Sequence, residues 1–398
     1  MTVSQRPIPG VYRNDQIPRT TLSLAVGVPV LIGLGRLRGE DPTPWRKLYQ
    51  FDTLATVWGA ANNSNLAESY LPEAVRGFFA NGGNVCYVMA LANLDAATLD
   101  QALSRLQALD DIDLVCAPDL MVTNRASNAL LSNAALIQRQ RQLLEHCDRM
   151  GDRFALLDHR PHQPDLRRQL SELEQQRQQL HSPNGALYFP WIRVSTERAP
   201  ARLVPPCGHL AGIYARLDQQ VGVHQAPANQ VIEGAVGLGT SLSTAQERDL
   251  YNPQPNQGAV NLIRALPGRG IRVWGAYTLS RDRRWRYINV RRLVLTVKRW
   301  VELNLTQLAF EPNTPQLWSA IRRDLGDYLT GLFQAGALHG ASPEEGFYVK
   351  CDAETNPESV RSQGRVVTEI GLAPLEPGEF IRVTLVQSLS GGSEATVL

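Results

Sequence analysis

Several residues of this chain belong to types that hold metal ions or cleave bonds, so their spacing is tested first. Asp158, His159 and His162 stand together in the segment DHRPH, where a carboxylate and two imidazoles could form a weak metal site. Zinc sites generally have more ligands at defined spacing, and a proline separates the two histidines here. We therefore expect a solvated loop after a strand, and the sequence predicts no metal site.

A serine–histidine–acid triad can be assembled from this sequence only by free choice. Asp119, His209 and Ser241 could be nominated, but the chain lacks the GxSxG elbow that carries the nucleophile of α/β hydrolases. An isolated histidine such as His209 is better explained by a local structural partner than by a role as ligand or base. The sequence thus contains no recognisable catalytic constellation.

Two glycine-containing turns could bind a phosphate through their backbone amides. Gly237-Leu238-Gly239 lacks the Lys-Ser/Thr of a Walker A loop and the full glycine pattern of a dinucleotide site. Residues 267–270 (PGRG) could also face an anion, although a plain turn is the simpler interpretation. No cofactor is predicted.

Charge and composition exclude several classes of protein. The 398 residues are 43% hydrophobic and 20% charged, and 40 Lys+Arg against 38 Asp+Glu give a net charge of +2. Such a near-neutral chain has no electrostatic case for dedicated nucleic-acid binding. The arginines of RDRRWRYINVRR (281–292) could bind phosphates, but Asp282 is interleaved, so ion pairs within or between subunits are the better interpretation.

The cysteines and the apolar segments indicate where the chain folds. Its five cysteines are far apart and form no CxxC pair, which predicts buried free thiols in a reducing compartment. No signal peptide is visible, and residues 22–34 are too short and too interrupted by Gly and Pro to span a bilayer. We expect synthesis and folding in the cytoplasm.

The elements that would position any site alternate between strand and helix in the first half of the chain. This order predicts parallel βαβ crossovers and a doubly wound sheet in an α/β fold. The predicted strands are residues 22–34, 85–91, 112–117, 153–158 and 186–194, and the predicted helices are residues 64–80, 96–109, 125–150 and 164–181.

The second half is expected to be α+β, with extended chain ends. A helix at 207–218 precedes a loop-rich section, 219–257. We then expect strands at 258–266, 270–279, 304–312 and 346–352, helices at 288–303 and 315–338, a terminal strand pair at 365–371 and 379–386, and a flexible tail. The predicted domains are an N-terminal arm (1–21), an α/β domain (22–265), a C-terminal core (266–379) and a C-terminal strand and tail arm (380–398).

Several ordered phrases resemble contractile tail sheath proteins of phage tails and contractile injection systems. Most of residues 204–381 take part, whereas 92–195 agrees only in its βαβ pattern and corresponds to the family's variable part. The phrases are PGVY (9–12), VPPCGHLAGIYARLD (204–218), GVHQAPAN (222–229), GAVNLIRALPGRGIRVWGAYTLS (258–280), WRYINVRRL (285–293), FEPN (310–313), LW (317–318), GALHGASPEEGFYVKCD (336–352), TNP (355–357) and IGLAPLEPGEFI (370–381).

The resemblance implies a structural subunit rather than an enzyme. Such subunits form hexameric rings that stack into a helical tube, and the tube contracts without nucleotide to drive an inner tube through a target envelope. The fold implied is a subtilisin-like βαβ region without protease chemistry, followed by the sheath core. Extended arms would pair with strands of neighbouring subunits, through Pro9, Gly10, Val11, Tyr12, Phe380, Ile381, Val383 and Leu385.

The implied partners are further copies of the chain, the inner tube protein, and baseplate and terminator proteins, with no direct nucleic-acid contact and no membrane insertion. The assembled protein would lie in a virion or in a released or anchored extracellular particle. The resemblance implies that a C-terminal helix contacts the inner tube through basic side chains. The commoner explanation of basic side chains on a helix is that they form its solvent-exposed face. The candidates are Arg291, Arg292, Lys298 and Arg299 on one helix and Arg322 and Arg323 on the other.

Two other functions stay open at this point. One is an α/β hydrolase-like or nucleotide-binding enzyme, which would need a cleft that joins a serine, a histidine and an acid. The other is a non-contractile, sheath-related adaptor, which would stay monomeric or form a single ring.

Overall fold

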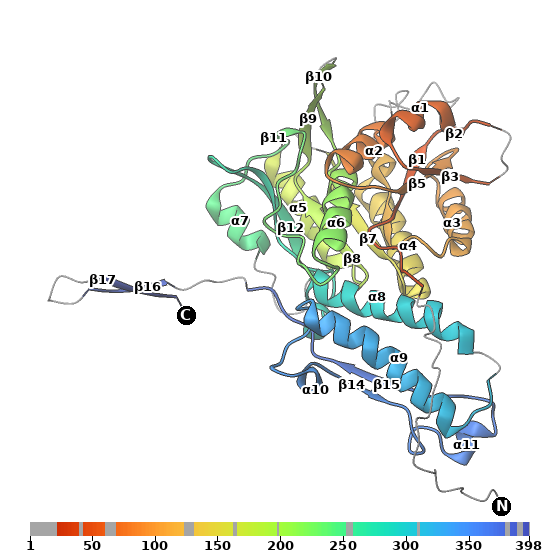
Figure 1. Ribbon diagram of the computed structural model, residues 1–398. Helices are drawn as coiled ribbons and strands as arrows, with labels where there is room; N and C mark the ends of the chain where they lie inside the picture. The colour runs from red at the N-terminus through yellow and green to blue at the C-terminus, as the bar shows by residue number, and fades with distance from the viewer. Residues whose placement is uncertain are drawn as a thin grey trace, which may run out of the picture.

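The computed structural model describes residues 22–39, 43–59, 69–122, 131–161, 165–196, 199–251, 258–308, 311–378, 383–387 and 393–397. A large sheet with helices on both faces forms the upper body in Figure 1, and a smaller layer of two helices and a strand pair lies beneath it. Of the predicted arm residues, Pro9, Gly10, Val11, Tyr12, Phe380 and Ile381 lie outside the described residues.

The central sheet has eight strands in the order β13-β12-β8-β7-β6-β1-β5-β3. Its six inner strands are mutually parallel, and the two edge strands are antiparallel to their neighbours. The parallel strands are short apolar runs, as expected for strands covered on both faces. The predicted parallel βαβ arrangement is therefore confirmed. The strands are β1 (Pro29–Leu34), β3 (Trp45–Leu48), β5 (Cys86–Leu91), β6 (Leu114–Cys116), β7 (Phe154–Asp158), β8 (Gly185–Phe189), β12 (Val260–Leu266) and β13 (Gly270–Trp274).

Alternate residues of each inner strand pack on opposite faces of the sheet. In β1, Val30 and Ile32 join one core and Leu31 joins the other. The first core contains α3 (Ala96–Arg105), α4 (Asn133–Met150) and α5 (Leu166–Gln179), and the second contains α2 (Leu71–Ala80) and α6 (Cys207–Gln220).

Close packing between α2 and α6 requires glycine. A Cβ built on Gly208 would lie 2.4 Å from the Ala74 Cα, and one on Gly212 would lie 2.3 Å from the Phe78 carbonyl oxygen. The two helices are therefore packed on each other by backbone-to-backbone approach. All five cysteines are buried free thiols, as predicted.

The lower layer is organised around α8 (Ile288–Leu305), which is buried on most sides. α9 (Pro315–Gln334) packs against it, and the rings of Trp300 and Tyr328 stack with their centroids 4.1 Å apart. Beneath α9, β14 (Phe347–Lys350) pairs antiparallel with β15 (Glu369–Leu372). The short helices α10 (Pro343–Gly346) and α11 (Glu358–Arg361) complete this layer.

Several predicted elements end or continue elsewhere in the structure. The strand predicted at 186–194 is divided at Pro190, which has no N–H for the ladder, and its second half joins another sheet with order β10-β9-β11. Only residues 29–34 of the strand predicted at 22–34 pair in a sheet, and the strand predicted at 304–312 is wrong because α8 and a 3₁₀ turn, Thr306–Leu308, occupy 304–308. The remaining elements are β2 (Arg36–Leu37), β4 (Trp58–Gly59), α1 (Leu54–Val57), β9 (Ile192–Thr196), β10 (Ala199–Val204), β11 (Ala235–Leu238), α7 (Thr244–Tyr251) and 3₁₀ turns at Phe51–Thr53, Leu106–Ala108, Pro118–Met121 and Arg283–Trp285.

The C-terminal pairing also differs from the prediction. β15 pairs with β14 and not with the segment 379–386. Instead β16 (Val383–Gln387) pairs with β17 (Ser393–Val397), so residues expected in a flexible tail form the second strand of a hairpin. The predicted division at 265/266 falls inside the β12–β13 hairpin, which belongs to the central sheet.

Candidate assembly surfaces

The proposed triad residues do not form a catalytic site. Asp119 lies after β6, beside the end of β1, where its carboxylate accepts hydrogen bonds from Leu34 N (2.6 Å), Ser69 Oγ (2.5 Å) and Tyr70 N (2.6 Å). His209 is buried against Gly77 of α2, and Ser241 is exposed. Burial raises the pKa of Asp119 to about 6 and lowers that of His209 to about 4. Asp119 therefore ties together the chain at the carboxyl ends of β1 and β6, which is a structural role.

The proposed metal residues belong to a buried polar network instead. Asp158 ends β7, and its carboxylate accepts a hydrogen bond from Cys207 N at 3.0 Å. His159 Nδ1 lies 2.6 Å from Gln176 Oε1, and Trp191 Nε1 donates to the His159 carbonyl at 2.7 Å. The predicted solvated loop is thus wrong for His159, which is buried, whereas Asp158 ends β7 as the predicted strand 153–158 required. His162 lies outside the described residues. The described part of the chain contains no group of three metal-binding side chains.

Neither glycine-containing turn is built as a phosphate cradle. Gly237 lies in β11, paired with Arg193 of β9. Residues 267–270 turn β12 into β13, and Arg269 N donates to the Leu266 carbonyl at 2.9 Å. Gly268 and Gly270 have φ values of 71° and 78°, which favour glycine over other residues. The plain-turn interpretation of this segment is confirmed.

A buried charge cluster joins α8 to the sheet. Arg292 donates two hydrogen bonds to the Asp218 carboxylate, at 2.7 and 2.6 Å, and a third to Asp113 Oδ2 at 2.9 Å. Arg299 Nη1 lies 3.9 Å from the same Asp113 oxygen, and its Nη2 donates to the Asp110 carbonyl at 3.3 Å. Arg292 and Arg299 point into the subunit and are buried, so they are removed from the predicted tube-contact set.

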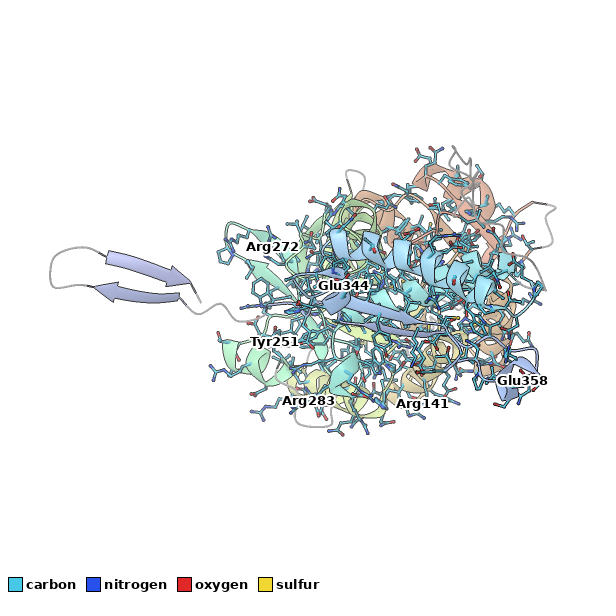
Figure 2. All side chains as sticks on the ribbon, turned by 60° about the horizontal axis from the view of Figure 1, so that its bottom comes forward. Arg141, Tyr251, Arg272, Arg283, Glu344 and Glu358 are labelled. Atoms are coloured by element: carbon cyan, nitrogen blue, oxygen red, sulfur yellow. The ribbon has the colours of Figure 1, made fainter. Side chains whose placement is uncertain are left out.

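The other predicted contact residues lie nearer the surface. Arg291 donates to Asn184 Oδ1 at 2.8 Å and lies over the Trp285 ring, whereas Lys298 is exposed and donates to the Met150 carbonyl at 3.2 Å. Arg322 donates to the Cys351 carbonyl and to Ser319 Oγ. Arg323 is exposed and contacts the neighbouring Asp324 at 3.1 Å. Figure 2 turns the underside of the molecule toward the viewer, with Glu344 of α10 and Glu358 of α11 labelled in the lower layer.

Sequence reasoning missed Asp113 and Asp218 as partners of Arg292. The three residues are separated by 74 and 179 positions, and only the pairing of β6, α6 and α8 brings them together. In the sequence, the one indication that Asp113 is buried is its position directly before the apolar strand LVC. Burial of a charge usually requires a partner, but a sequence does not say which carboxylates are buried.

Two strand pairs offer edges for assembly. In the described part of the chain, β14 and β15 pair only with each other, and Tyr348 on β14 is 57% exposed. β16 and β17 form a hairpin that stands away from the body in Figure 1. Val383 and Leu385, two of the predicted arm residues, lie in β16 opposite Val397 and Ala395.

The described helices include none that is both long and apolar enough to cross a membrane.

Comparisons with known proteins point to one family. Residues 96–279 match the phage tail sheath protein central domain, and residues 280–388 match the phage tail sheath C-terminal domain. The major tail sheath protein of Serratia phage KSP20 is 23% identical over 225 residues, which are 56% of this chain and 54% of that protein. The chain thus spans about half the length of this curated relative.

Solved structures agree over nearly the whole chain. A chain of the anti-feeding prophage (AFP) baseplate in its contracted state has a TM-score of 0.77 at 27% identity, over 97% of this chain and 100% of that one. A chain of the PVC sheath complex, from an extracellular contractile injection system in its contracted state, has a TM-score of 0.73 at 25% identity, over 98% and 99%. The relatives are structural sheath proteins, which confirms the prediction that the chain is not an enzyme. With two sheath domains matched across residues 96–388, the chain belongs to the phage tail sheath family.

Proposed function

We propose that the chain is the sheath subunit of a contractile injection system or phage-like tail. It would assemble with copies of itself into hexameric rings stacked as a helical tube around an inner tube, bound to a baseplate and closed by a terminator. The main support is the match over 98% of the chain to a sheath complex in its contracted state. Electron micrographs of the protein expressed with its inner tube test this, and particles that lack striated tubes would contradict it.

In this proposal, neighbouring subunits are linked by β-augmentation through both chain ends. The two-stranded β14–β15 ribbon supports this, because a ribbon of two strands is marginal alone and its outer edges lack strand partners in the described residues. The β16–β17 hairpin would reach one neighbour and residues 1–21 another. Backbone hydrogen bonds would keep the subunits attached while they move.

Removal of residues 1–21 is expected to abolish tube formation and leave a folded monomer. The described core and its contacts begin at Leu22, whose backbone amide donates to Asn304 Oδ1 at 2.8 Å, so the truncation removes none of them. Negative-stain microscopy measures tubes, and circular dichroism checks the fold. Long tubes formed by the truncated chain would contradict the arm assignment.

The inner tube would contact the exposed face of α9 rather than α8, which is mostly buried. Arg323 is the exposed arginine on α9, whereas Arg322 is engaged with the Cys351 carbonyl. Contacts that must break on firing favour exposed ion pairs, each worth about 0–1 kcal/mol. Because this weak contact would repeat with every subunit along the tube, the summed free energy of the contacts would hold the sheath on the inner tube.

Arg323→Glu is therefore expected to reduce co-assembly with the inner tube several-fold, because the substitution reverses the charge of the proposed contact. The melting temperature should not change, because the side chain is exposed to solvent. Co-sedimentation of sheath and tube measures the effect. Arg141→Glu, at an exposed position of α4 that is labelled in Figure 2, is the matched control and should bind normally. Equal co-sedimentation of the two variants would remove α9 from the interface.

We propose four parts in the chain. The central sheet, a subtilisin-like βαβ region without protease chemistry, would extend through the β12–β13 hairpin. The sheath core would then begin near residue 280. An N-terminal arm of residues 1–21 would precede the sheet region, and a C-terminal arm that begins at residue 380 would follow the sheath core.

Contraction would proceed by re-packing of subunits into a lower-energy arrangement, without nucleotide. The chain would be made in the cytoplasm and end in a virion or an extracellular particle.

A second candidate is a sheath-related adaptor that forms a single ring. It is favoured by the matches to chains in AFP baseplate structures. Particles with one ring at the baseplate, in place of long tubes, would support this second candidate.

A further inference from the structure

The segment Leu22–Val28 connects the lower layer to the sheet without belonging to any strand, and we call it the strap. At its start, Leu22 N donates to Asn304 Oδ1 at 2.8 Å, and Asn304 lies near the end of α8. At its end, Gly27 N and Val28 N donate to the two oxygens of Asp113, at 3.0 and 2.7 Å. The Val28 carbonyl accepts from Asp113 N at 3.0 Å. Two side chains thus fix both ends of the strap.

Asp113 is itself immobilised. It is buried, and Arg292 donates to the same Oδ2 atom that accepts from Gly27 N. Gly27 has φ +69°, and a Cβ on it would lie 2.5 Å from the Ala215 Cα, so this turn can pass over α6 only as glycine. The sheet end of the strap, at Gly27 and Val28, is therefore held by charge and by close backbone approach.

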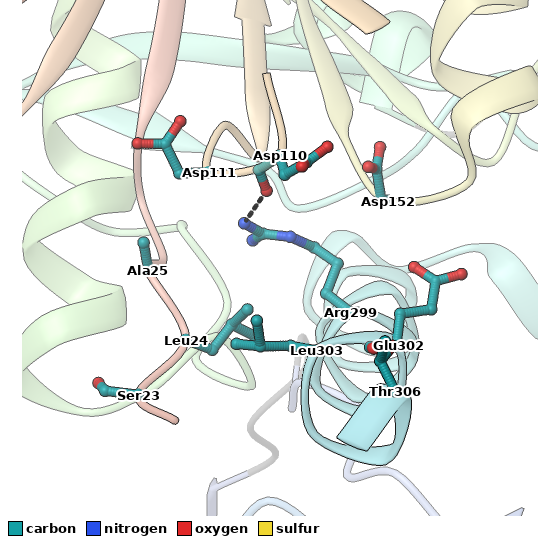
Figure 3. A pocket seen from close by; sticks show the side chains of 10 residues that line it. All are labelled: Ser23, Leu24, Ala25, Asp110, Asp111, Asp152, Arg299, Glu302, Leu303 and Thr306. Carbon is teal, nitrogen blue, oxygen red and sulfur yellow. Dashed lines mark hydrogen bonds between the residues drawn. The ribbon is translucent and has the colours of Figure 1, made fainter. Parts of the chain in front are cut away.

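Between these two ends the strap bridges both layers. Leu24 packs against the cluster that contains Trp300, and Val26 packs against the cluster that contains Leu293. Its residues Ser23, Leu24 and Ala25 form one wall of a cleft of about 480 Å³. Figure 3 shows the strap on one side of this cleft, α8 on another, and the acidic loops of the sheet domain above. The cleft leaves Leu24 and Val26 only partly buried, so the hydrogen bonds at the two ends act together with this apolar packing to hold the strap.

We infer that Asp113 and Asn304 are positioning residues for assembly, because they fix the point at which the N-terminal residues leave the subunit. This inference rests on the proposed function. A released strap of seven residues could span roughly 24 Å, so the exit point would move over a large volume. The effective concentration of the N-terminal arm at the neighbouring subunit would fall accordingly.

The decisive variant is Asn304→Ala in the full-length chain, because it removes the acceptor for Leu22 N without exposing a buried charge. We expect hydrogen exchange at the Leu22 amide to become at least about tenfold faster, since its bond to Asn304 Oδ1 is lost while Gly27 N and Val28 N stay bonded to Asp113. The subunit concentration needed for half-maximal tube formation should rise about tenfold, with the melting transition still cooperative. Asp113→Asn is a second variant expected to act in the same direction.

Two matched variants separate positioning from general damage. Thr306→Ala changes a residue that lines the same cleft but bonds to Glu302 and not to the strap, so exchange and assembly should match the wild type. Asn304→Asp keeps the acceptor for Leu22 N and should restore assembly. Fast exchange in Asn304→Ala with normal assembly would overturn the inference. Wild-type protein that forms no tubes would overturn the proposed function and this inference with it.

Discussion

Replacement of Arg292 by methionine is expected to lower the free energy of unfolding by about 3–5 kcal/mol, the usual cost of removing one partner of a buried ion pair. Arg292, Asp113 and Asp218 have side chains that are 5%, 6% and 1% exposed. Methionine fills a similar length but leaves both carboxylates without the guanidinium. Urea denaturation measures the change, and an unaltered m-value would show that the loss concerns stability alone.

A matched substitution on the same helix serves as the control. Lys298→Met removes an exposed charge that lies 3.5 Å from Glu302, and such surface pairs contribute about 0–1 kcal/mol. Adding Asp218→Asn to Arg292→Met should recover part of the loss, because it neutralises the carboxylate that loses both of its hydrogen bonds from Arg292. A loss below about 1 kcal/mol for Arg292→Met would mean that water reaches the cluster.

The repeating strand–helix order was predictable because the inner strands are short apolar runs separated by amphipathic helices. Partner choice was not predictable. The strand at 365–371 was paired with the segment next to it in sequence, whereas the structure pairs β15 with β14 across residues 351–368. Local pattern fixes which residues form a strand, but distant packing selects the strand beside it. The segment 304–308 (NLTQL) likewise has a pattern that favours a strand, but the end of α8 and a 3₁₀ turn occupy it in the structure.

The candidate contact residues show the same division. Arg291, Arg292, Lys298 and Arg299 suggested one wet basic face of a helix. In the structure Arg292 and Arg299 turn inward because Asp113 and Asp218 neutralise them, while Lys298 stays in water. Helical periodicity cannot distinguish a buried arginine from an exposed one, since the acidic partners lie on other elements, Asp113 directly before β6 and Asp218 in α6. Arg323 lies where its helical position predicted, on the exposed side of α9.

Asp158→Asn is expected to stabilise the protein at alkaline pH and to have little effect near pH 4. Burial raises the pKa of Asp158 to about 7, whereas the unfolded carboxyl titrates near its ordinary value of about 4. The folded state therefore holds a proton that the unfolded state releases between about pH 4 and 7. This group's contribution to stability is complete below pH 4 and is lost as the pH rises through 7.

The size of this effect follows from the interval of about three pH units, each worth about 1.4 kcal/mol, so the variant should gain about 3–4 kcal/mol over the wild type between pH 4 and pH 8. Asparagine retains an oxygen to accept the hydrogen bond from Cys207 N, made at 3.0 Å by the carboxylate. The free energy of unfolding of the variant must be compared with that of the wild type at each pH, because other buried groups also titrate in this range. Burial also raises the pKa of Asp119 to about 6 and lowers those of His159 and His209 to about 4, which gives opposing slopes in the parent protein.

A carboxylate with the opposite shift provides the control. Asp95 caps α3, and the hydrogen bond from Thr98 N, at 2.7 Å, lowers its pKa. Its contribution is present above the unfolded pKa of about 4 and is lost as the pH falls below it, so Asp95→Asn should show a nearly constant deficit from about pH 5 to pH 8 that disappears as the pH falls below 4. In the same urea melts, Asp158→Asn should instead gain stability over the wild type as the pH rises from 4 to 8. Parallel curves for Asp158→Asn and the wild type would show that Asp158 is ionised in the folded state throughout this range.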